Sequence, residues 1–485
     1  MLDLVLLHPE IPSRVYGAIP HGQNAIETPI WCGNLATYVR NHGFEVAIVD
    51  MAAENLTVEE VAKTINGLHP RLTAAVIYSK QPSASTHNVT VAGEVLRQVD
   101  GLTMMIGGHP SALPERTLQE EKCTYVAIGE GAETLRRWLE GVKLEKIPGL
   151  AFLEESQCIK TAPSALLSDL DESFPMPAWD LLPMARYRNY NWASWGYPSR
   201  QPYAAFYGSL GCWAACEFCA VQSPFYAGQK VAGLTKNLRR TWSPERIGQT
   251  LEHLATQYGI THVRIADEMF LSGRRWVNTI CDEIIQRGLT LNLYVYARAD
   301  TCQDRPLLEK MKKAGFRWLC LGFESSSEAT RKLVGKNYSN DVVKNAVQNL
   351  HEAGINLLAN YIVGLRNETI ADMENTLQEA MEMQPEFFNI YCATPYPGSP
   401  LFTRAVQENW PLPKKWEDYS QFSKNFTPHG TETISPKEVV KFRDEAFKRF
   451  LSNPAYQAKV ERQFGVAAKE DVQRMAGAKQ ERVHV

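Results

Sequence analysis

Three cysteines lie close together at Cys212, Cys216 and Cys219, in a chain of 485 residues that has ten cysteines in all. Three residues separate the first two and two residues separate the last two, so three thiolates of one loop can reach one inorganic group. Thiolates are the preferred ligands of iron–sulfur clusters, and three of them leave one iron of a 4Fe–4S cluster open to another ligand. A structural zinc site needs a fourth cysteine or histidine nearby, and the nearest downstream histidine is His253. The triplet therefore predicts an iron–sulfur cluster, with a zinc site or three unrelated buried thiols as the alternatives.

The segments that must position this triplet alternate between strand and helix patterns over residues 201–400. The strand-like segments are residues 204–208, 262–266, 292–297, 318–323, 357–363 and 387–392. Six strands joined by helical crossovers predict a partial (β/α)6 barrel, and the triplet follows its first strand. Chemistry in barrels takes place at the carboxyl ends of the strands, which is where the triplet would lie. Residues 401–485 are predicted to form a smaller, helical C-terminal region.

The stretch 211–219 resembles the cysteine motif of the radical S-adenosylmethionine (SAM) superfamily, with Phe218 at the aromatic position before the last cysteine. Further turns resemble motifs of that family: the acidic turn 266–270, the G-x-E-S turn 322–325, the strand end 360–365 with Glu368, and the segment 396–401. The resemblance implies a cluster that cleaves SAM reductively to a 5′-deoxyadenosyl radical. The residues that it implies for SAM binding are Phe218, Asp267, Glu268, Glu324, Ser325 and Gly364.

The charged residues in this set also have simpler interpretations. An acidic residue after a strand often caps a helix, so Asp267 and Glu324 could be caps. Arg298 follows the third strand and is a further candidate for SAM binding. It either binds a carboxylate or pairs with Asp300. The sequence identifies no catalytic acid or base.

Residues 1–142 form a separate region in which strand-like and helical segments alternate. Its strand-like segments are residues 4–7, 45–49, 74–78, 103–106 and 125–128, with helical stretches between them. This pattern predicts a doubly wound, Rossmann-like α/β domain with a parallel sheet, whose ligands bind beyond the carboxyl ends of the strands. The proline-rich residues 143–200 are predicted to be a connector packed on the surface.

A doubly wound domain ahead of a radical SAM barrel resembles the cobalamin-dependent radical SAM enzymes. The turns that carry this resemblance are residues 79–86, 107–110 and 129–131, where small residues let a bulky ligand approach the backbone. The residues predicted to contact cobalamin are His8, Pro9, Ser79, Gln81, Ser83, Ser85, Gly107, Gly108, His109, Gly129, Glu130 and Gly131. The motif D-x-H-x-x-G, which supplies a histidine ligand to cobalt, is absent, so we expect no histidine on cobalt. The alternative is that these turns bind another ligand or none.

Composition narrows the class of protein. Hydrophobic residues make up 44% and charged residues 22% of the chain, as is typical of globular proteins. The net charge of −3 gives no indication of a nucleic acid partner. No apolar run is long enough to cross a bilayer, and the apolar start is short and carries Asp3, so we expect a cytoplasmic protein without a signal peptide.

The resemblance implies a function of the methyltransferase type. We expect an oxygen-sensitive enzyme that methylates an unactivated carbon of a small molecule or peptide and receives electrons from flavodoxin or ferredoxin. A radical cyclase or rearrangement enzyme of the same architecture is one alternative. A cobalamin sensor without turnover is the alternative from another class.

Overall fold

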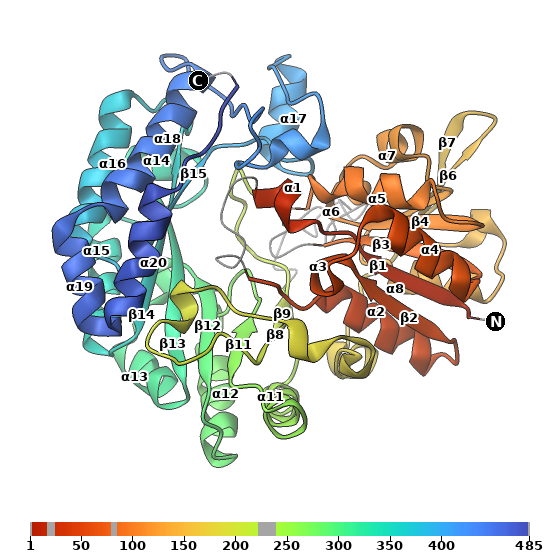
Figure 1. Cartoon of the computed structure of the whole chain (residues 1–485), viewed down its shortest axis with the longest axis horizontal. Helices are drawn as coiled ribbons and strands as arrows, with labels where there is room; N and C mark the ends of the chain where they lie inside the picture. The colour runs from red at the N-terminus through yellow and green to blue at the C-terminus, as the bar shows by residue number, and fades with distance from the viewer. Residues whose placement is uncertain (1, 17–24, 79–84, 222–238, 484–485) are drawn as a thin grey trace.

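The computed structural model describes residues 2–16, 25–78, 85–221 and 239–483. Within these residues the N-terminal sheet has the strand order β2–β1–β3–β4–β5–β6–β7. The parallel strands are β1 (Leu4–His8), β2 (Val46–Asp50), β3 (Leu72–Ile77), β4 (Leu102–Gly107) and β5 (Tyr125–Ala127). Their carboxyl ends point toward the second sheet (Figure 1). The predicted doubly wound domain is confirmed.

Side chains of this sheet alternate between two helical layers, because successive residues of a strand face opposite sides. Even-numbered residues of β1 pack with α2 (Ile30–Asn41) and α8 (Ala132–Leu139). Odd-numbered residues of β1 pack with α4 (Val58–Leu68) and α5 (Asn88–Leu96) on the other face.

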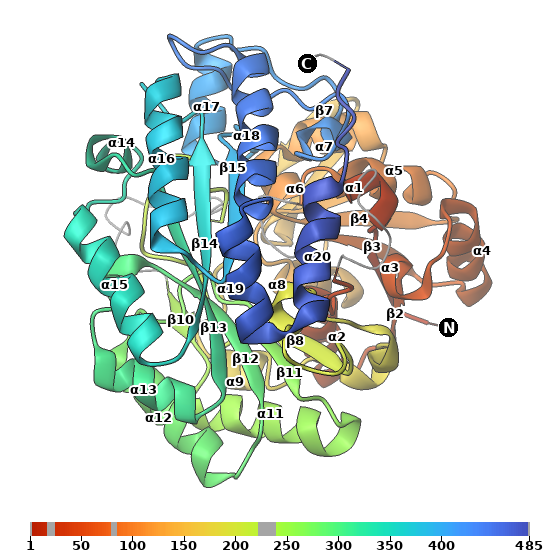
Figure 2. The same ribbon diagram turned by 60° about the vertical axis from the view of Figure 1, so that its left-hand side comes forward.

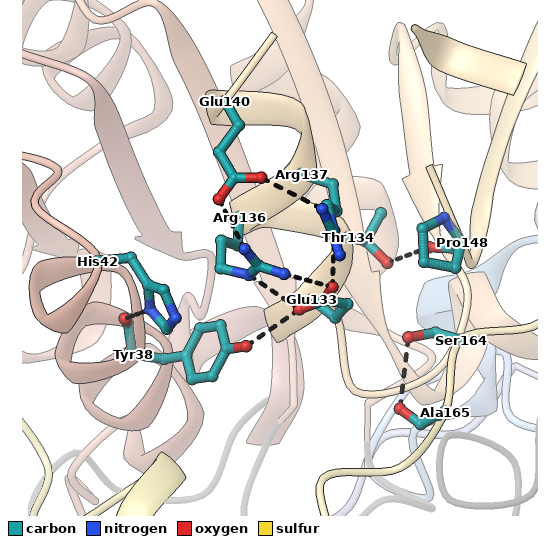
Figure 3. A network of polar contacts seen from close by, with 10 residues as sticks. All are labelled: Tyr38, His42, Glu133, Thr134, Arg136, Arg137, Glu140, Pro148, Ser164 and Ala165. Carbon is teal, nitrogen blue, oxygen red and sulfur yellow. Dashed lines mark hydrogen bonds and ion pairs between the residues drawn. The ribbon is translucent and has the colours of Figure 1, made fainter. Parts of the chain in front are cut away.

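Polar contacts also join α2 to α8 (Figure 3). The Tyr38 hydroxyl donates to the Glu133 carboxylate at 3.1 Å. Arg136 donates to the same carboxylate at 2.6 Å and to Glu140 at 2.6 Å. The network contains none of the residues predicted to bind a ligand, so its contribution is to the stability of this helical layer.

The stretch predicted to be a surface connector is more buried than expected. β6 (Leu150–Glu154) and β7 (Gln157–Lys160) form an antiparallel hairpin that continues the first sheet beyond β5. Phe174, Trp179 and Tyr187 are at most 2% exposed and belong to a hydrophobic cluster that contains residues of both sheets. The second half of this stretch is therefore an interdomain layer, because its aromatic side chains bury their area between the two domains.

The second sheet, in the part of the chain that is described, contains six parallel strands in the order β15–β14–β13–β12–β11–β8. They are β8 (Tyr203–Phe206), β11 (His262–Ile265), β12 (Asn292–Ala297), β13 (Phe316–Glu324), β14 (Asn356–Val363) and β15 (Phe387–Cys392). The helices that follow them include α11 (Pro244–Tyr258), α12 (Arg274–Gln286), α13 (Arg305–Lys313), α15 (Asn340–Glu352) and α16 (Ile370–Met383). This is the predicted partial barrel, and β8 and β15 are its edges.

The C-terminal region is helical, as predicted. It contains α17 (Pro400–Gln407), α18 (Pro436–Leu451), α19 (Pro454–Phe464) and α20 (Val466–Gly477), and α18 packs on β15 (Figure 2). The Phe464 ring stacks on Trp318 at a centroid distance of 5.7 Å, and Trp192 meets Trp318 edge-on at 5.1 Å. These rings fill the amino-terminal end of the barrel, so its open end is the carboxyl end. No helix of the described residues is long and apolar enough to cross a membrane.

A short segment of the N-terminal domain covers the free edge of β8. The Thr28 hydroxyl donates to the carbonyl oxygen of Ala205 at 2.8 Å and accepts from the Ala205 amide at 2.9 Å. One side chain thus takes the place of a neighbouring strand at this position and satisfies both backbone groups.

Replacing Thr28 with valine keeps the shape of the side chain and removes both hydrogen bonds. Because two buried backbone groups would then lack partners, we expect the free energy of unfolding to fall by about 2–4 kcal/mol. Urea unfolding of the anaerobic protein measures this. The control is Thr64→Val, which removes a hydrogen bond to the carbonyl of Glu60 at an exposed position; equal stability of the two variants would contradict the role of Thr28.

Candidate active site

The three cysteines lie on one loop that leaves the carboxyl end of β8. β9 (Ser209–Leu210) pairs with β10 (Arg240–Thr241) and holds the base of this loop. Cys212 and Cys216 are 7% and 9% exposed, and the Cys219 amide donates to the Cys216 carbonyl at 3.1 Å. The three cysteines therefore lie on one short stretch of this loop, where Cys212 and Cys216 are buried and Cys219 is partly buried.

A glycine lets the segment after α14 (Glu328–Leu333) approach the cysteine loop. Gly335 has a φ of +86°, and a Cβ atom there would lie 2.9 Å from the carbonyl oxygen of Ala215. The Glu217 amide donates to the carbonyl of Val334 at 3.2 Å. The close approach places Lys336 beside the thiols.

The electrostatics of the thiols suit a bound metal cluster. Burial raises the pKa of Cys212 to about 11 and also raises the pKa of Cys216, so neither thiol ionises readily by itself. Lys336 and Arg298 act in the opposite direction and favour the Cys216 thiolate. Iron binding displaces the thiol protons, and the two cations stabilise the resulting negative charge.

A cavity of about 360 Å³ adjoins the thiols. It is lined by all three cysteines, by residues at the carboxyl ends of β11 to β15, and by Ser420, Gln421 and Phe422 of the C-terminal region. His87, which follows β3 in the N-terminal domain, lines it as well. Both domains and the C-terminal region therefore contribute to one site.

The two acidic residues after β11 have different environments. Asp267 accepts hydrogen bonds from the amides of Gly208 and Ser209, at 2.7 and 2.9 Å, and from the Ser209 hydroxyl at 2.5 Å. Its carboxylate fixes the backbone that leads into the cysteine loop. Glu268 lines the cavity, and its buried Oε2 has no hydrogen-bond partner among the described residues. Burial raises the pKa of Glu268 to about 8.

Arg298 pairs with Asp300, which is one of the two interpretations that the sequence left open. It donates to Asp300 at 3.0 and 2.8 Å, while its buried Nη1 has no hydrogen-bond partner within the described part of the chain. Its guanidinium lies over the rings of Trp213 and Tyr338, with centroid distances of 5.0 and 5.4 Å. One unpaired carboxylate oxygen on Glu268 and one unpaired guanidinium nitrogen on Arg298 fit the ammonium and carboxylate groups of a zwitterionic amino acid moiety.

Glu324 is held in an unusual conformation beside the cavity. It has a φ of +67° and forms a buried ion pair with Lys336. Lys336 also donates to the carbonyl of Gly322 at 2.8 Å, and a Cβ atom at Gly322 would lie 2.7 Å from the lysine nitrogen. Burial lowers the pKa of Lys336, but the attractions of Glu324, Tyr338 and Cys216 together outweigh burial, so the net shift of this pKa is upward.

The remaining predicted SAM-binding residues divide into two groups. Phe218 lines the cavity. Ser325 is fully buried away from it and donates to Glu368 at 2.9 Å. Gly364 also lies behind the cavity wall, where a Cβ atom would come within 2.7 Å of Val439. Ser325 and Gly364 therefore contact protein, and their influence on the cavity passes through the turns that they hold.

The residues predicted to contact cobalamin lie at the carboxyl edge of the first sheet. Ser79, Gln81 and Ser83 are outside the described residues. The others are all buried: His8, Pro9, Ser85, Gly107, Gly108, His109, Gly129, Glu130 and Gly131. Gly107 has a φ of +137°, and a Cβ atom there would lie 2.2 Å from the carbonyl oxygen of Ile77, so only glycine fits this turn.

Two side chains of this set have informative surroundings. The Glu130 carboxylate forms an ion pair with Arg240 and accepts from the amide of Leu167 at 3.2 Å, so it is engaged between the domains. His109 is 2% exposed, and its ring lies edge-on to Trp416 with a centroid distance of 4.4 Å. Neither of its ring nitrogens has a hydrogen-bond partner among the described residues. Burial, with a smaller effect of Arg116, lowers the pKa of His109 to about 3. An unpaired buried ring and glycine turns fit a site for a large polar ligand at this edge.

Sequence reasoning missed several contributors to the site, and Lys336, Arg264 and Gln421 are examples. Lys336 follows a glycine in a segment without a recognised motif. Arg264 lies within a strand and lines the cavity, where it pairs with Glu27 of the N-terminal domain. Gln421, whose side chain accepts from the Cys392 amide at 2.8 Å, lies in an irregular segment. No local pattern marks any of them, because each reaches the cavity only through packing of distant segments.

Comparison with known proteins agrees with this architecture. Residues 207–380 match the family model of the radical SAM superfamily, and residues 24–139 match the model of the B12 binding domain. An uncharacterized methyltransferase of Pyrococcus horikoshii is 27% identical over 425 residues, which cover 85% of this chain and 87% of the relative. An anaerobic magnesium-protoporphyrin IX monomethyl ester cyclase of Cereibacter sphaeroides is 26% identical over 419 residues, or 83% of this chain and 63% of the relative.

The fold is also found among solved structures. The radical SAM methyltransferase TsrM of Kitasatospora setae, solved with cobalamin and a 4Fe–4S cluster bound, aligns with a TM-score of 0.65 at 17% identity, over 94% of this chain and 90% of that chain. The chain belongs to the radical SAM superfamily and carries a B12 binding domain ahead of the radical SAM domain. It is a cobalamin-dependent radical SAM enzyme, and its cofactors are a 4Fe–4S cluster, SAM and cobalamin.

Replacing Cys216 with alanine should abolish the cluster, because the two remaining thiolates of the loop leave a second iron without a protein ligand. We expect loss of bound iron and of the thiolate-to-iron absorbance in anaerobically purified protein. The control is Cys123→Ala, a buried thiol of the N-terminal domain, which should keep full iron content. Stoichiometric zinc without iron in the wild-type protein would contradict the assignment.

The buried His109 predicts a specific pH dependence of stability in the cobalamin-free protein. Its pKa of about 3 in the folded state lies below the unfolded value, so the unfolded state binds more protons as the pH falls. Stability contributed by the neutral ring is present near pH 7.5 and declines below about pH 6.5, with a loss of about 2 kcal/mol by pH 5.

The variant His109→Phe should lack this loss, and urea unfolding at both pH values measures the difference. The control is His253→Phe, at a partly exposed position of α11, which should retain the wild-type pH dependence. An identical pH dependence of His109→Phe and wild type would refute the buried neutral state.

Proposed function

We propose that this enzyme methylates an unactivated carbon of a small-molecule or peptide substrate. One observation carries the proposal: residues of the B12 binding domain and the three cysteines line the same cavity, through His87 and the loop of Cys212, Cys216 and Cys219. The relative from Pyrococcus horikoshii and TsrM, whose names describe methyltransferases, support it. Bound cofactors would supply a 5′-deoxyadenosyl radical for hydrogen abstraction and a methyl group on cobalt.

The residues of the barrel would divide the work of holding SAM and the cluster. Cys212, Cys216 and Cys219 would bind iron. The unpaired oxygen of Glu268 and the unpaired nitrogen of Arg298 would bind the ammonium and carboxylate groups of SAM. Glu324 and Phe218 would line the rest of the molecule.

Asp267, Ser325 and Gly364 would act indirectly, because their side chains or backbone hold the turns around this cavity.

The carboxyl edge of the first sheet would hold cobalamin. His8, Pro9, Ser85 and the turns at Gly107–His109 and Gly129–Gly131 would form the described part of that site, and Ser79, Gln81 and Ser83 are predicted to complete it. Cobalt would carry no histidine from the protein, since the chain has no D-x-H-x-x-G motif.

The reaction also requires an electron donor and a reducing compartment. A flavodoxin or ferredoxin is the proposed donor. The cytoplasm is the proposed location, because the thiols that bind the cluster must stay reduced.

A cyclase or rearrangement is the second candidate reaction. The specific observation in its favour is the 26% identity to the magnesium-protoporphyrin ester cyclase over 83% of this chain. Both candidates begin with hydrogen abstraction, so they differ in what happens to the substrate radical. A sensor without turnover is not favoured, because the three cysteines, Glu268 and Arg298 line one cavity.

Incubation with SAM that carries a deuterated methyl group distinguishes these reactions. With the correct substrate we expect deoxyadenosine and a product that contains the label. The variant Cys219→Ala should stop both while retaining cobalamin, because the iron ligands and the first sheet lie in different domains. Deoxyadenosine with an unlabelled, cyclised product would support the cyclase, and absence of deoxyadenosine with every candidate substrate would refute both reactions.

A further inference from the structure

The N-terminal domain inserts a carboxylate into the interior of the barrel. Glu27 lies one residue before Thr28, whose side chain occupies the free edge of β8. The Glu27 carboxylate accepts two hydrogen bonds from Nη1 of Arg264, at 2.9 and 2.8 Å. The side chains of Arg264 and Glu27 are 3% and 5% exposed, so this ion pair between the domains is almost fully removed from water.

The pair belongs to the wall of the active-site cavity. Arg264 comes from β11 and lines the cavity beside Glu268. Its guanidinium lies over the ring of Tyr296, 5.1 Å from the centroid. The Tyr294 hydroxyl donates to Glu27 at 3.4 Å. Glu27 therefore forms an ion pair with a cavity residue of the barrel, although it lies in the other domain.

A second ion pair between the domains does not reach the cavity. Glu130 at the carboxyl edge of the first sheet pairs with Arg240 of β10, and neither residue lines the cavity. Both pairs join an acid of the first domain to an arginine of the barrel. Only the Glu27 pair connects the docking of the domains to a residue at the site of chemistry.

We propose that Glu27 is a positioning residue that sets the B12 binding domain against the barrel and holds Arg264 in the cavity wall. A buried arginine that loses its carboxylate must recruit water or move, so Arg264 would shift and the edge at Thr28 would loosen. Cobalamin bound to the first domain would then be displaced relative to the substrate. The measurement of methylated product rests on the proposed function. The measurement of hydrogen exchange does not depend on it.

The test compares Glu27→Gln, which keeps the shape and removes the charge, with a matched control elsewhere. The control is Glu386→Gln: Glu386 is another buried carboxylate, paired with Lys459 at 2.7 Å at the amino-terminal end of β15. Iron content, cobalamin content, deoxyadenosine and methylated product are measured for both variants. Hydrogen exchange of peptides that cover residues 25–34 and 203–207 reports domain docking without any cofactor.

We expect Glu27→Gln to retain iron and cobalamin and to form deoxyadenosine, while the ratio of deoxyadenosine to methylated product rises by roughly tenfold to a hundredfold. Exchange should increase at residues 25–34 and 203–207. Glu27→Asp should restore part of the coupling, and Glu386→Gln should keep the wild-type ratio. If Glu27→Gln does not fold, Glu27→Asp replaces it, with a smaller rise of the ratio and of the exchange as the expectation.

A wild-type ratio and wild-type exchange in the Glu27 variant would overturn the inference. An equal rise in Glu386→Gln would also overturn it, since the effect would then follow from lower stability alone. If the wild-type enzyme forms no methylated product, the proposed function fails, and hydrogen exchange alone decides whether Glu27 docks the domains.

Discussion

The free edge of β8 is the constraint on which the arrangement of this enzyme depends. A barrel of parallel strands that does not close leaves backbone groups of its edge strand without partners, and burial of such groups is costly. Here the N-terminal domain satisfies those of Ala205 with the hydroxyl of Thr28 and pairs Glu27 with Arg264. Docking of the first domain thus supplies partners to backbone groups that the incomplete closure of the barrel leaves unpaired. The connector adds apolar area to it with Phe174 and Trp179.

Polar groups around the cavity fall into two classes by what they contact. Asp267 and Ser325 form hydrogen bonds with backbone groups or neighbouring side chains, so they fix the loops. Glu268 and Arg298 keep one atom each without a partner in the described chain. Unpaired buried polar atoms are unfavourable, and two of them on residues that line one cavity fit a ligand that would complete both. This distinction separates residues that shape the cavity from residues suited to bind a ligand in it. All four residues follow strands, and no sequence pattern distinguishes the two classes.

The positive charge near the thiols comes from the packing of distant segments and not from the cysteine motif. The motif stretch 211–219 contains no cation, and burial alone would keep its thiols protonated. Lys336 reaches the loop because Gly335 and Gly322 have no side chains in the way. Its partner Glu324 is held at a positive φ, a conformation that the surrounding turn must impose. The charge of the site therefore depends on segments more than a hundred residues from the triplet.

The sequence by itself determined the two sheets, their strand positions within a few residues, and the cysteine triplet with its chemistry. These features follow from local patterns: hydrophobic periodicity specifies strands, and ligand spacing within one loop specifies a cluster. Only the tertiary structure decided that 150–160 extends the first sheet, that the following aromatics lie between domains, and that Ser325 and Gly364 lie behind the cavity wall. Only it paired Glu27 with Arg264 across 237 residues of chain. The physical reason is that such contacts depend on how distant, individually ordinary segments pack, and a local pattern carries no information about the partner.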